Sequence, residues 1–222
     1  MKSYNLLIKT FCLLPLLVMA CSAEAPTIDS RVVRLPFYQE ATFNPVWLGP
    51  GEQPPEGFHQ VPAFSLTNQE GEAVTEATFA NKIYVTDFFF TVCPGICPKM
   101  TTNMALLQEA FLNDEEVLLL SHSVTPTRDS VPVLKAYAEQ KGIRSDKWHL
   151  VTGDQREIYL LGRKAYFVEE NLGLEKLDEE FLHTENFVLV DKNRYLRGIY
   201  NGLNRASIEQ LIADIRTLQA EG

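Results

Sequence analysis

Positive charge, cysteine and late proline are all scarce in this sequence. Its 222 residues carry a formal net charge of −9, which argues against nucleic-acid binding and against a polybasic membrane patch. We find no Ser-His-Asp set, no phosphate-binding glycine loop, no outstanding pair of carboxylates and no internal repeat. Only four cysteines are present, and no proline follows Pro132. The hydrophobic content of 45% is still ample for one compact domain with its own core.

The first 20 residues have the pattern of a signal peptide. Two lysines precede a short apolar stretch, Phe11–Ala20. This stretch is too short for a membrane span, which needs roughly 20 apolar residues. It ends on Val18-Met19-Ala20-Cys21, which resembles a bacterial lipobox and implies cleavage before Cys21 and acylation of that residue. We therefore expect residues 1–20 to be a lipoprotein signal peptide, with a plain signal-anchor as the alternative.

Processing at this point would decide which cysteines remain free. Cleavage would discard Cys12 and acylation would block Cys21, which leaves Cys93 and Cys97 as thiols. The mature protein is then expected outside the cytoplasm, on the periplasmic side of a membrane to which lipid tethers it. Disulfides persist in that compartment, so both the thiol and the disulfide form of the pair are possible there.

Proline divides the rest of the chain into two parts. Seven of the twelve prolines lie between Pro26 and Pro62, and a segment so rich in proline is expected to be irregular because each proline removes a ladder donor. We predict a tether and irregular arm over residues 21–60, with short edge strands possible at Val32–Tyr38 and Thr42–Trp47. The domain proper is predicted over residues 61–222.

Apolar and polar residues in this domain alternate in the manner of strands and helices. A hairpin is expected around the turn 68–71, and near-continuous apolar runs predict buried strands. The predicted strands are Ala63–Thr67, Glu72–Thr75, Ile83–Phe90, Val117–Val124, Trp148–Val151, Phe187–Val190 and Tyr195–Tyr200. The predicted helices are Lys99–Leu112, Val131–Lys141, Asp154–Ala165 and Arg205–Ala220. This order predicts an α/β domain of thioredoxin-like fold, with a central mixed β-sheet flanked by helices and an N-terminal hairpin extension.

Two cysteines stand where a predicted buried strand gives way to a helix. Pro94 and Gly95 oppose a regular helix between Cys93 and Cys97, and Pro98 is suited to the first helical position, with Cys97 as the N-cap. A helix N-terminus favours negative charge, so we expect the nearby thiols to ionise readily. The tight loop also keeps the two sulfurs close enough to share a metal or to form a disulfide.

Two thiolates are soft ligands that select Cu(I), with zinc as the main competitor. A structural zinc site takes four protein ligands, and the sequence has no second cysteine pair to complete that set. A site of two cysteines and one histidine suits Cu(I) better and leaves the ion accessible. Whether the pair holds copper or exchanges disulfides is left open by these residues.

Three segments resemble the Sco/SenC family: Cys93-Pro94-Gly95-Ile96-Cys97-Pro98 after an aromatic strand, Ser123–Asp129 after the next strand, and Phe181–Thr184 before the last hairpin. The resemblance extends from about Val61 to Ala220. It implies a thioredoxin-fold copper-binding protein that takes part in assembling the copper site of cytochrome c oxidase. It also implies Cys93, Cys97 and His183 as the copper ligands. Thr125 stands where many relatives have Asp, so any role of that acid is not carried over.

Other residues near these segments have two interpretations each. Asp87 lies six residues before Cys93, where thioredoxins place a buried acid. It is either a buried proton relay with a raised pKa or a residue at the strand start that is exposed or paired with Lys82. His122 shares a strand face with apolar residues and is interpreted as a hydrogen-bonded core histidine. Met100 lies at helical spacing from Cys97 and is interpreted as core packing rather than as an extra ligand.

The leading hypothesis is a lipid-anchored, monomeric copper chaperone whose partner is the copper-bearing subunit of cytochrome c oxidase or another copper or thiol protein. The alternative is an enzyme, a thiol-disulfide oxidoreductase with Cys93 as the attacking thiol and Cys97 as its redox partner. A redox or copper sensor is a third class. Thioredoxins carry a cis-proline opposite the dithiol, just before the strand equivalent to Phe187–Val190, but this chain has no proline between Pro132 and its end. Its absence weakens the oxidoreductase hypothesis and leaves room for His183 to approach the sulfurs.

Overall fold

The computed structural model describes residues 29–169 and 181–221. The predicted signal peptide, the predicted lipidation site Cys21 and most of the loop before Phe181 therefore lie outside the described residues. Within the described ranges, no helix is both long enough and apolar enough to cross a membrane.

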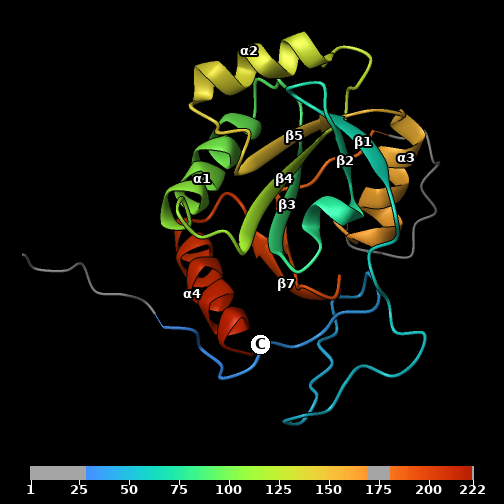
Figure 1. Ribbon diagram of the computed structural model, residues 1–222, viewed down its shortest axis with the longest axis vertical. Helices are drawn as coiled ribbons and strands as arrows, with labels where there is room; N and C mark the ends of the chain where they lie inside the picture. The colour runs from blue at the N-terminus through green and yellow to red at the C-terminus, as the bar shows by residue number, and fades with distance from the viewer. Residues whose placement is uncertain (1–28, 170–180, 222) are drawn as a thin grey trace, which may run out of the picture.

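In the described part of the chain, seven strands form one mixed sheet at the centre of the molecule (Figure 1). Their order across the sheet is β2-β1-β5-β4-β3-β6-β7. The three strands β3, β4 and β5 are parallel, and every other neighbouring pair is antiparallel. The strands are β1 Ser65–Asn68, β2 Ala73–Thr75, β3 Ile83–Phe89, β4 Val117–Ser123, β5 Trp148–Thr152, β6 Asn186–Val190 and β7 Leu196–Asn201.

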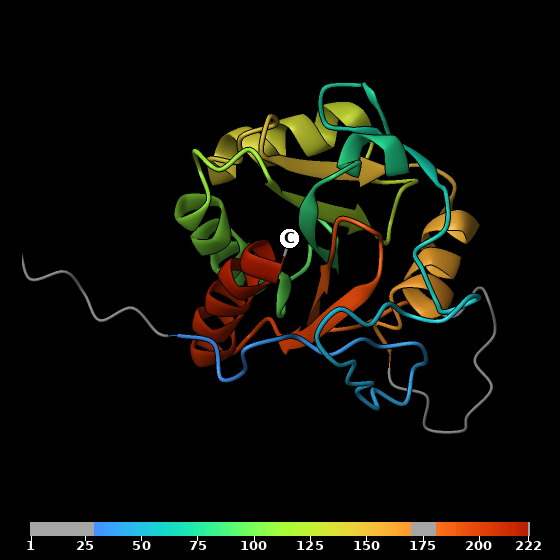
Figure 2. The ribbon, with the colours of Figure 1, turned by 60° about the horizontal axis from the view of Figure 1, so that its bottom comes forward.

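Helices cover both faces of this sheet (Figures 1 and 2). The helices α1 and α4 lie side by side on one face, and α3 packs on the other. Among the described residues the helices are α1 Cys97–Ala110, α2 Val131–Lys141, α3 Gln155–Leu160 and α4 Arg205–Glu221, with a 3-10 turn η1 Glu76–Phe79 and a π-helical turn η2 Leu161–Ala165. This arrangement confirms the predicted α/β class and the central mixed sheet.

The two central strands, β3 and β4, explain why the site lies where it does. All seven residues of each strand are buried, as expected for a strand covered on both faces. They are neighbours in parallel register, from Ile83 opposite Val117 to Phe89 opposite Ser123. Their carboxyl ends therefore meet at the same edge of the sheet, and the Cys93 loop leaves from that edge.

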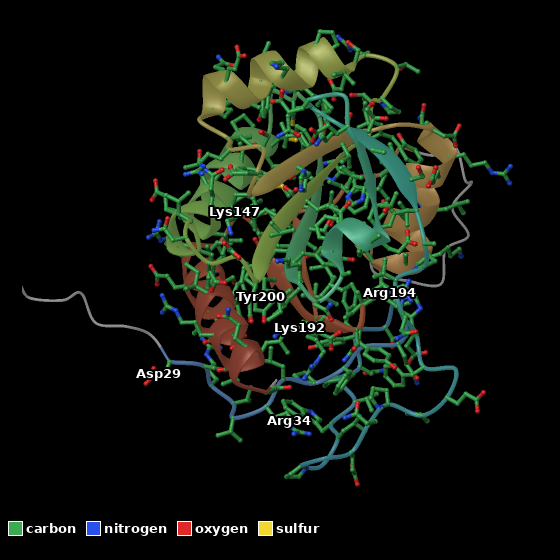
Figure 3. All side chains as sticks on the ribbon, in the orientation of Figure 1. Asp29, Arg34, Lys147, Lys192, Arg194 and Tyr200 are labelled. Carbon is green, nitrogen blue, oxygen red and sulfur yellow. The ribbon has the colours of Figure 1, made fainter. Side chains whose placement is uncertain are left out.

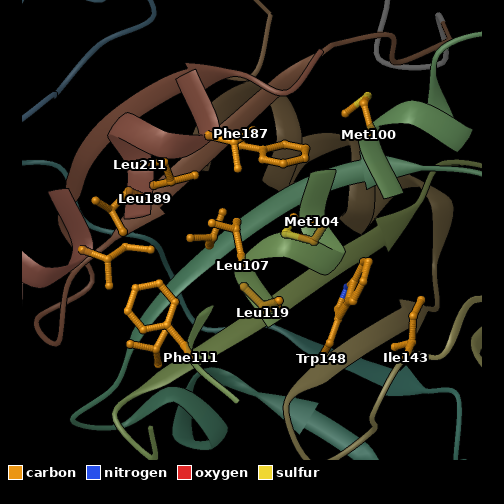
Figure 4. Packing of buried hydrophobic residues seen from close by; sticks show 14 of the residues in the cluster. Met100, Met104, Leu107, Phe111, Leu119, Ile143, Trp148, Phe187, Leu189 and Leu211 are labelled. Atoms are coloured by element: carbon orange, nitrogen blue, oxygen red, sulfur yellow. The ribbon is translucent and has the colours of Figure 1, made fainter. Parts of the chain in front are cut away.

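The helix that follows the loop is held by an apolar stripe on one of its sides. Met100, Met104 and Leu107 are completely buried, and Phe111 at the helix end is nearly so. Figure 4 shows these side chains in line above the sheet, with Leu119, Trp148 and Phe187 among their neighbours. The stripe confirms the predicted helical period and the interpretation of Met100 as core packing.

Several element boundaries differ from the prediction. Helix α1 begins at Cys97 with Ile96 as N-cap, so Cys97 is the first helical residue rather than the cap. The predicted helix Asp154–Ala165 has the expected cap, because the Asp154 side chain accepts from the Glu157 N–H. It is α-helical only to Leu160 and then widens into η2. Helix α2 has the predicted bounds, and Gly142 ends it with φ of 67°, a conformation that favours glycine.

The described part of the irregular arm, residues 29–60, is anchored to the domain at a few buried residues. Leu35 and Phe37 are 3% and 7% exposed, and the edge strands expected in this arm are reduced to two isolated bridges. The buried guanidinium of Arg197 donates to the carbonyl oxygens of Leu35 and Pro36 at 2.8 and 3.0 Å. The neighbouring Arg34, which Figure 3 shows on the arm, donates to a carbonyl within the arm.

Two carboxylates form ion pairs with Arg197. Asp191 lies 3.1 Å from its Nη1, and Glu221 of α4 lies 2.6 Å from its Nη2. The Glu221 side chain also accepts the Leu35 N–H at 2.7 Å. The arm, β7 and the end of α4 are therefore joined through one buried group. The predicted division at residues 60 and 61 stays a prediction, but arm residues contribute to the core.

Candidate metal and thiol site

The Cys93 loop forms a sharp exit from β3. The strand ends at Phe89, and the N–H of Cys93 donates back to the carbonyl of Phe90 at 3.3 Å, which closes a turn. The chain then enters α1, where the carbonyl of Ile96 accepts from the N–H groups of Lys99 and Met100. Both cysteines are thiols; Cys93 is partly exposed, and Cys97 is only 5% exposed.

The two thiols have opposite electrostatic environments. Partial burial disfavours the charged form of Cys93, but a hydrogen bond from the Cys97 thiol and the N–H groups of the loop outweigh it and lower the pKa of Cys93. Burial raises the pKa of Cys97 to about 12, and its hydrogen bond to Cys93 adds to this rise. The expectation that both thiols ionise readily is therefore right for Cys93 and wrong for Cys97. Cys97 faces the apolar core, where desolvation outweighs the helix N-terminus.

The predicted histidine faces the same cavity as the cysteines. A cavity of about 250 Å³ is lined on one side by the loop Cys93–Cys97 and on the other by the segment Phe181–Thr184. Phe90 and Phe181 meet at its rim, edge to face, with ring centroids 5.7 Å apart. The structure thus brings Cys93, Cys97 and His183 to one place, although they come from distant parts of the chain.

Alternate residues of the histidine segment are anchored in the core. Leu182 is 1% exposed, and the hydroxyl of Thr184 donates to the carbonyl of Val168 at 2.7 Å. The Leu182 side chain lies so close to Gly162 of η2 that a Cβ there would come within 2.6 Å of it, so a larger residue at this position would push Leu182 aside. His183, between the two anchors, is exposed, and its N–H donates to Glu169 at 3.3 Å.

The three predicted ligands share a cavity without forming a coordination cluster. Among residues 29–169 and 181–221, no three His, Cys, Asp or Glu side chains are near enough to one another to hold a metal ion. The donor set itself suits copper, because two thiolates and an imidazole are ligands that Cu(I) prefers. Their joint use as ligands stays a prediction, and it requires the His183 side chain to approach the sulfurs.

Asp87 is buried, so its interpretation as a residue that is exposed or paired with Lys82 is wrong. It is 2% exposed and accepts a short hydrogen bond from the Ser121 hydroxyl, which in turn accepts from the Trp148 indole N–H at 2.8 Å. Lys82 instead donates to the carbonyl of Glu115. Burial raises the pKa of Asp87 to about 7, although the bond from Ser121 opposes this rise.

His122 is a core histidine, as predicted. It is completely buried, stacks on Phe88 with ring centroids 4.6 Å apart, and has Nδ1 3.1 Å from the Thr86 hydroxyl. Burial lowers the pKa of His122 to about 3, so the ring is neutral at physiological pH. It lies on the sheet face opposite α1 and does not line the cavity.

The sequence reasoning missed Asp129, which is completely buried beside the Cys93 loop. Its carboxylate accepts from the hydroxyls of Thr91, Ser123 and Thr125. A signal was present, because Asp129 closes the segment after β4 that was quoted for its family resemblance. Its burial and its reach across to Thr91 were not visible in that segment.

A family model described as SCO1/SenC matches residues 52–220 of this chain. Among curated proteins, the SCO1 protein homolog of Bacillus subtilis is 29% identical over 163 residues, which cover 72% of this chain and 82% of that protein. A SCO1/SenC family lipoprotein from Bacillus anthracis is similar in structure, with a TM-score of 0.61, 28% identity, and coverage of 72% of this chain and 95% of that one.

Two further solved structures are similar over the same domain. One is BsSco, described as a member of the Sco family of cytochrome c oxidase assembly proteins with a disulfide switch; its TM-score is 0.60 at 28% identity, covering 72% of this chain and 93% of that one. The other is Arabidopsis thaliana ScoI with copper bound, with a TM-score of 0.55 at 25% identity, covering 70% and 97%. These similarities confirm the predicted thioredoxin-like fold.

Proposed function

The chain belongs to the SCO1/SenC family, and from this membership we propose that it is a copper chaperone for assembly of the copper site of cytochrome c oxidase. The observation that carries the proposal is the shared cavity of Cys93, Cys97 and His183. The copper bound to Arabidopsis ScoI and the assembly role in the description of BsSco support it. Copper is the cargo of such a protein rather than a resident cofactor.

Each residue of the site has a distinct role in this proposal. Cys93 is the partly exposed thiol with the lowered pKa, so it is suited to meet the incoming metal as a thiolate. Cys97 gives up its proton when it joins as the second sulfur ligand. His183 adds a nitrogen ligand from the opposite wall of the cavity. The apolar lining from Phe88 and Phe90 keeps water from the bound ion.

Oxidation would release the metal. When a partner disulfide oxidises the pair, it takes two electrons from the thiolates and two protons from solution and becomes two thiols, while Cys93 and Cys97 join as a disulfide. Both thiolate charges are then lost, so no soft anionic ligand remains for Cu(I). The two thiols are near enough for each to shift the pKa of the other, which supports this step. The disulfide switch described for BsSco supports this part of the proposal.

The proposed setting is the outer face of a membrane. Cleavage before Cys21 and lipidation of that residue would tether the arm of residues 21–60, so that the domain of residues 61–222 meets its partner on the periplasmic side. The partner is the copper-bearing subunit of the oxidase, and the chaperone acts as a monomer. The lipobox-like sequence and the lipoprotein description of the Bacillus anthracis relative support this setting.

The His183→Ala variant tests the ligand set. The reduced domain from Ala23 onward is expected to bind one Cu(I) per chain, and His183→Ala is expected to weaken this binding by about tenfold or more, because one of three ligands is lost. Competition with a Cu(I)-chelating dye measures both affinities. His149→Gln is the matched control, since His149 lies in β5 away from the cavity.

Two results would contradict the proposal. One is a reduced wild-type domain that binds no stoichiometric Cu(I). The other is an affinity in His183→Ala equal to that of His149→Gln, which would remove histidine from the ligand set.

A thiol-disulfide oxidoreductase is the second candidate, and one observation favours it. A partly exposed thiol with a lowered pKa next to a buried thiol is the arrangement of an attacking and a resolving cysteine. Fast reduction of a disulfide-bonded peptide that is abolished in Cys93→Ser and normal in His183→Ala would support the enzyme instead of the chaperone.

A further inference from the structure

A carboxylate that has no cationic partner among residues 29–169 and 181–221 is buried beside the cysteine loop. Asp129 is 0% exposed, and its recorded partners among the described residues are three hydroxyls and one N–H. The Thr91 hydroxyl lies 2.6 Å from Oδ1, and the hydroxyls of Ser123 and Thr125 lie 2.6 and 3.0 Å from Oδ2. The Thr91 N–H also donates to Oδ2, at 3.3 Å.

Such a group is costly to bury, and a core alone has no need of it. An ionised carboxylate loses its hydration on burial, and hydrogen bonds must replace that hydration in full. Four donors do so here. Two of them belong to Thr91, which follows β3, and the other two are the hydroxyls of Ser123, at the end of β4, and of Thr125, in the loop that carries Asp129. The carboxylate is therefore a crosslink between the end of β4 and the residue that follows Phe90.

This crosslink bears directly on the position of Cys93. The N–H of Cys93 donates to the carbonyl of Phe90, so Thr91 lies inside the turn that places the sulfur. Its neighbour Val92 is 55% exposed and gives the turn little packing. The two hydrogen bonds that Thr91 donates to Asp129 thus hold the middle of this turn.

We propose that Asp129 is a positioning residue for Cys93. The Asp129 carboxylate holds Thr91, inside the turn from Phe90 to Cys93, so that the Cys93 sulfur faces Cys97 and the cavity. The proposal rests on the proposed function only in that Cu(I) affinity is one of its readouts. Asp129 could instead have a purely structural role. Its carboxylate also accepts hydrogen bonds from Ser123 and Thr125, and these bonds hold the segment between β4 and α2.

Two threonines that donate to the same carboxylate separate these roles. Thr91→Val and Thr125→Val each remove one hydroxyl from Asp129 and keep the side-chain shape, but only the first touches the cysteine turn. Thr91→Val is expected to weaken Cu(I) binding about tenfold and to change the alkylation rate of Cys93 at least threefold. Thr125→Val is expected to leave both within twofold of wild type, and Thr91→Ser, which keeps the hydroxyl, is expected to restore both.

Amide hydrogen exchange provides a readout that is independent of copper. Thr91→Val is expected to speed exchange over residues 91–97 about tenfold, whereas Thr125→Val leaves that peptide unchanged. Circular dichroism of each variant tests whether it is folded. If Thr91→Val does not fold, Thr91→Ala takes its place.

Equal Cu(I) affinities in Thr91→Val and Thr125→Val would overturn the positioning role while leaving the chaperone proposal standing. A wild-type protein that binds no Cu(I) would overturn the chaperone proposal instead. In that case the alkylation rates decide for positioning if only Thr91→Val differs from wild type, and against it if the two variants agree.

Discussion

In the reduced protein at pH 7, Cys93 is expected to be alkylated by iodoacetamide at least about 100-fold faster than Cys97. The thiolate is the reacting species, and a thiol with a pKa of about 12 presents almost none of it at neutral pH. Burial of Cys97, the first residue of α1, against the core adds a barrier to the reagent, whereas Cys93 is partly exposed and has a lowered pKa. Mass spectrometry of the digested protein over time gives both rates.

The control for this experiment is the unfolded chain. In denaturant the two cysteines lose their different surroundings, so their alkylation rates are expected to agree within a few-fold. Similar rates in the folded protein would contradict the assignment of Cys93 as the reactive thiol. Such a result would also remove the basis for Cys93 as the first sulfur to meet copper or a partner disulfide.

The second large effect is expected from Asp87→Asn, which should stabilise the protein at pH 8 by up to about 4 kcal/mol. The pKa of Asp87 is about 7 in the folded protein and near 3.9 in the unfolded chain. Below pH 4 both states hold the proton, so ionisation of Asp87 makes no difference to stability. As the pH rises from 4 to 7 only the unfolded state releases the proton, which lowers the free energy of unfolding.

Asparagine removes this titration and keeps an oxygen that accepts from Ser121. The stability advantage of Asp87→Asn should therefore grow from about pH 4 to pH 7 and stay constant above, as measured by urea unfolding at a series of pH values. His122 titrates with the opposite sign: its folded pKa of about 3 makes stability fall as the pH drops below about 6.5. It is present in both proteins and cancels in the difference.

Two results would contradict the raised pKa of buried Asp87. One is a stability difference between wild type and Asp87→Asn that is the same at every pH, and the other is an Asp87→Asn variant that is less stable than wild type at pH 8. The predicted cost also bears on function. A carboxyl group that destabilises the fold at neutral pH, under the Cys97 thiol whose pKa it helps to raise, is easier to explain as part of the thiol chemistry than as part of the core.

Local patterns were enough to predict most elements of the sheet and its helices. The runs Ile83–Phe90 and Val117–Val124 are apolar without alternation, which is how a strand buried on both faces is recognised, and both became central strands. Helix α2 has its predicted bounds because Gly142 supplies the left-handed residue that ends it. The predicted first helical residue of α1 was Pro98, with Cys97 as the N-cap, but the helix begins one residue earlier, at Cys97. Cap positions depend on backbone geometry as well as on residue type.

The sequence by itself determined the chemistry of the site: two thiols at a strand-to-helix junction and one histidine before the last hairpin. Only the tertiary structure decided how these groups differ. The burial of Cys97, the burial of Asp87 and the crosslink from Asp129 to Thr91 all arise where segments distant in the chain pack together. Desolvation and hydrogen bonding set the charge of such groups, and both depend on three-dimensional neighbours that no local sequence pattern contains.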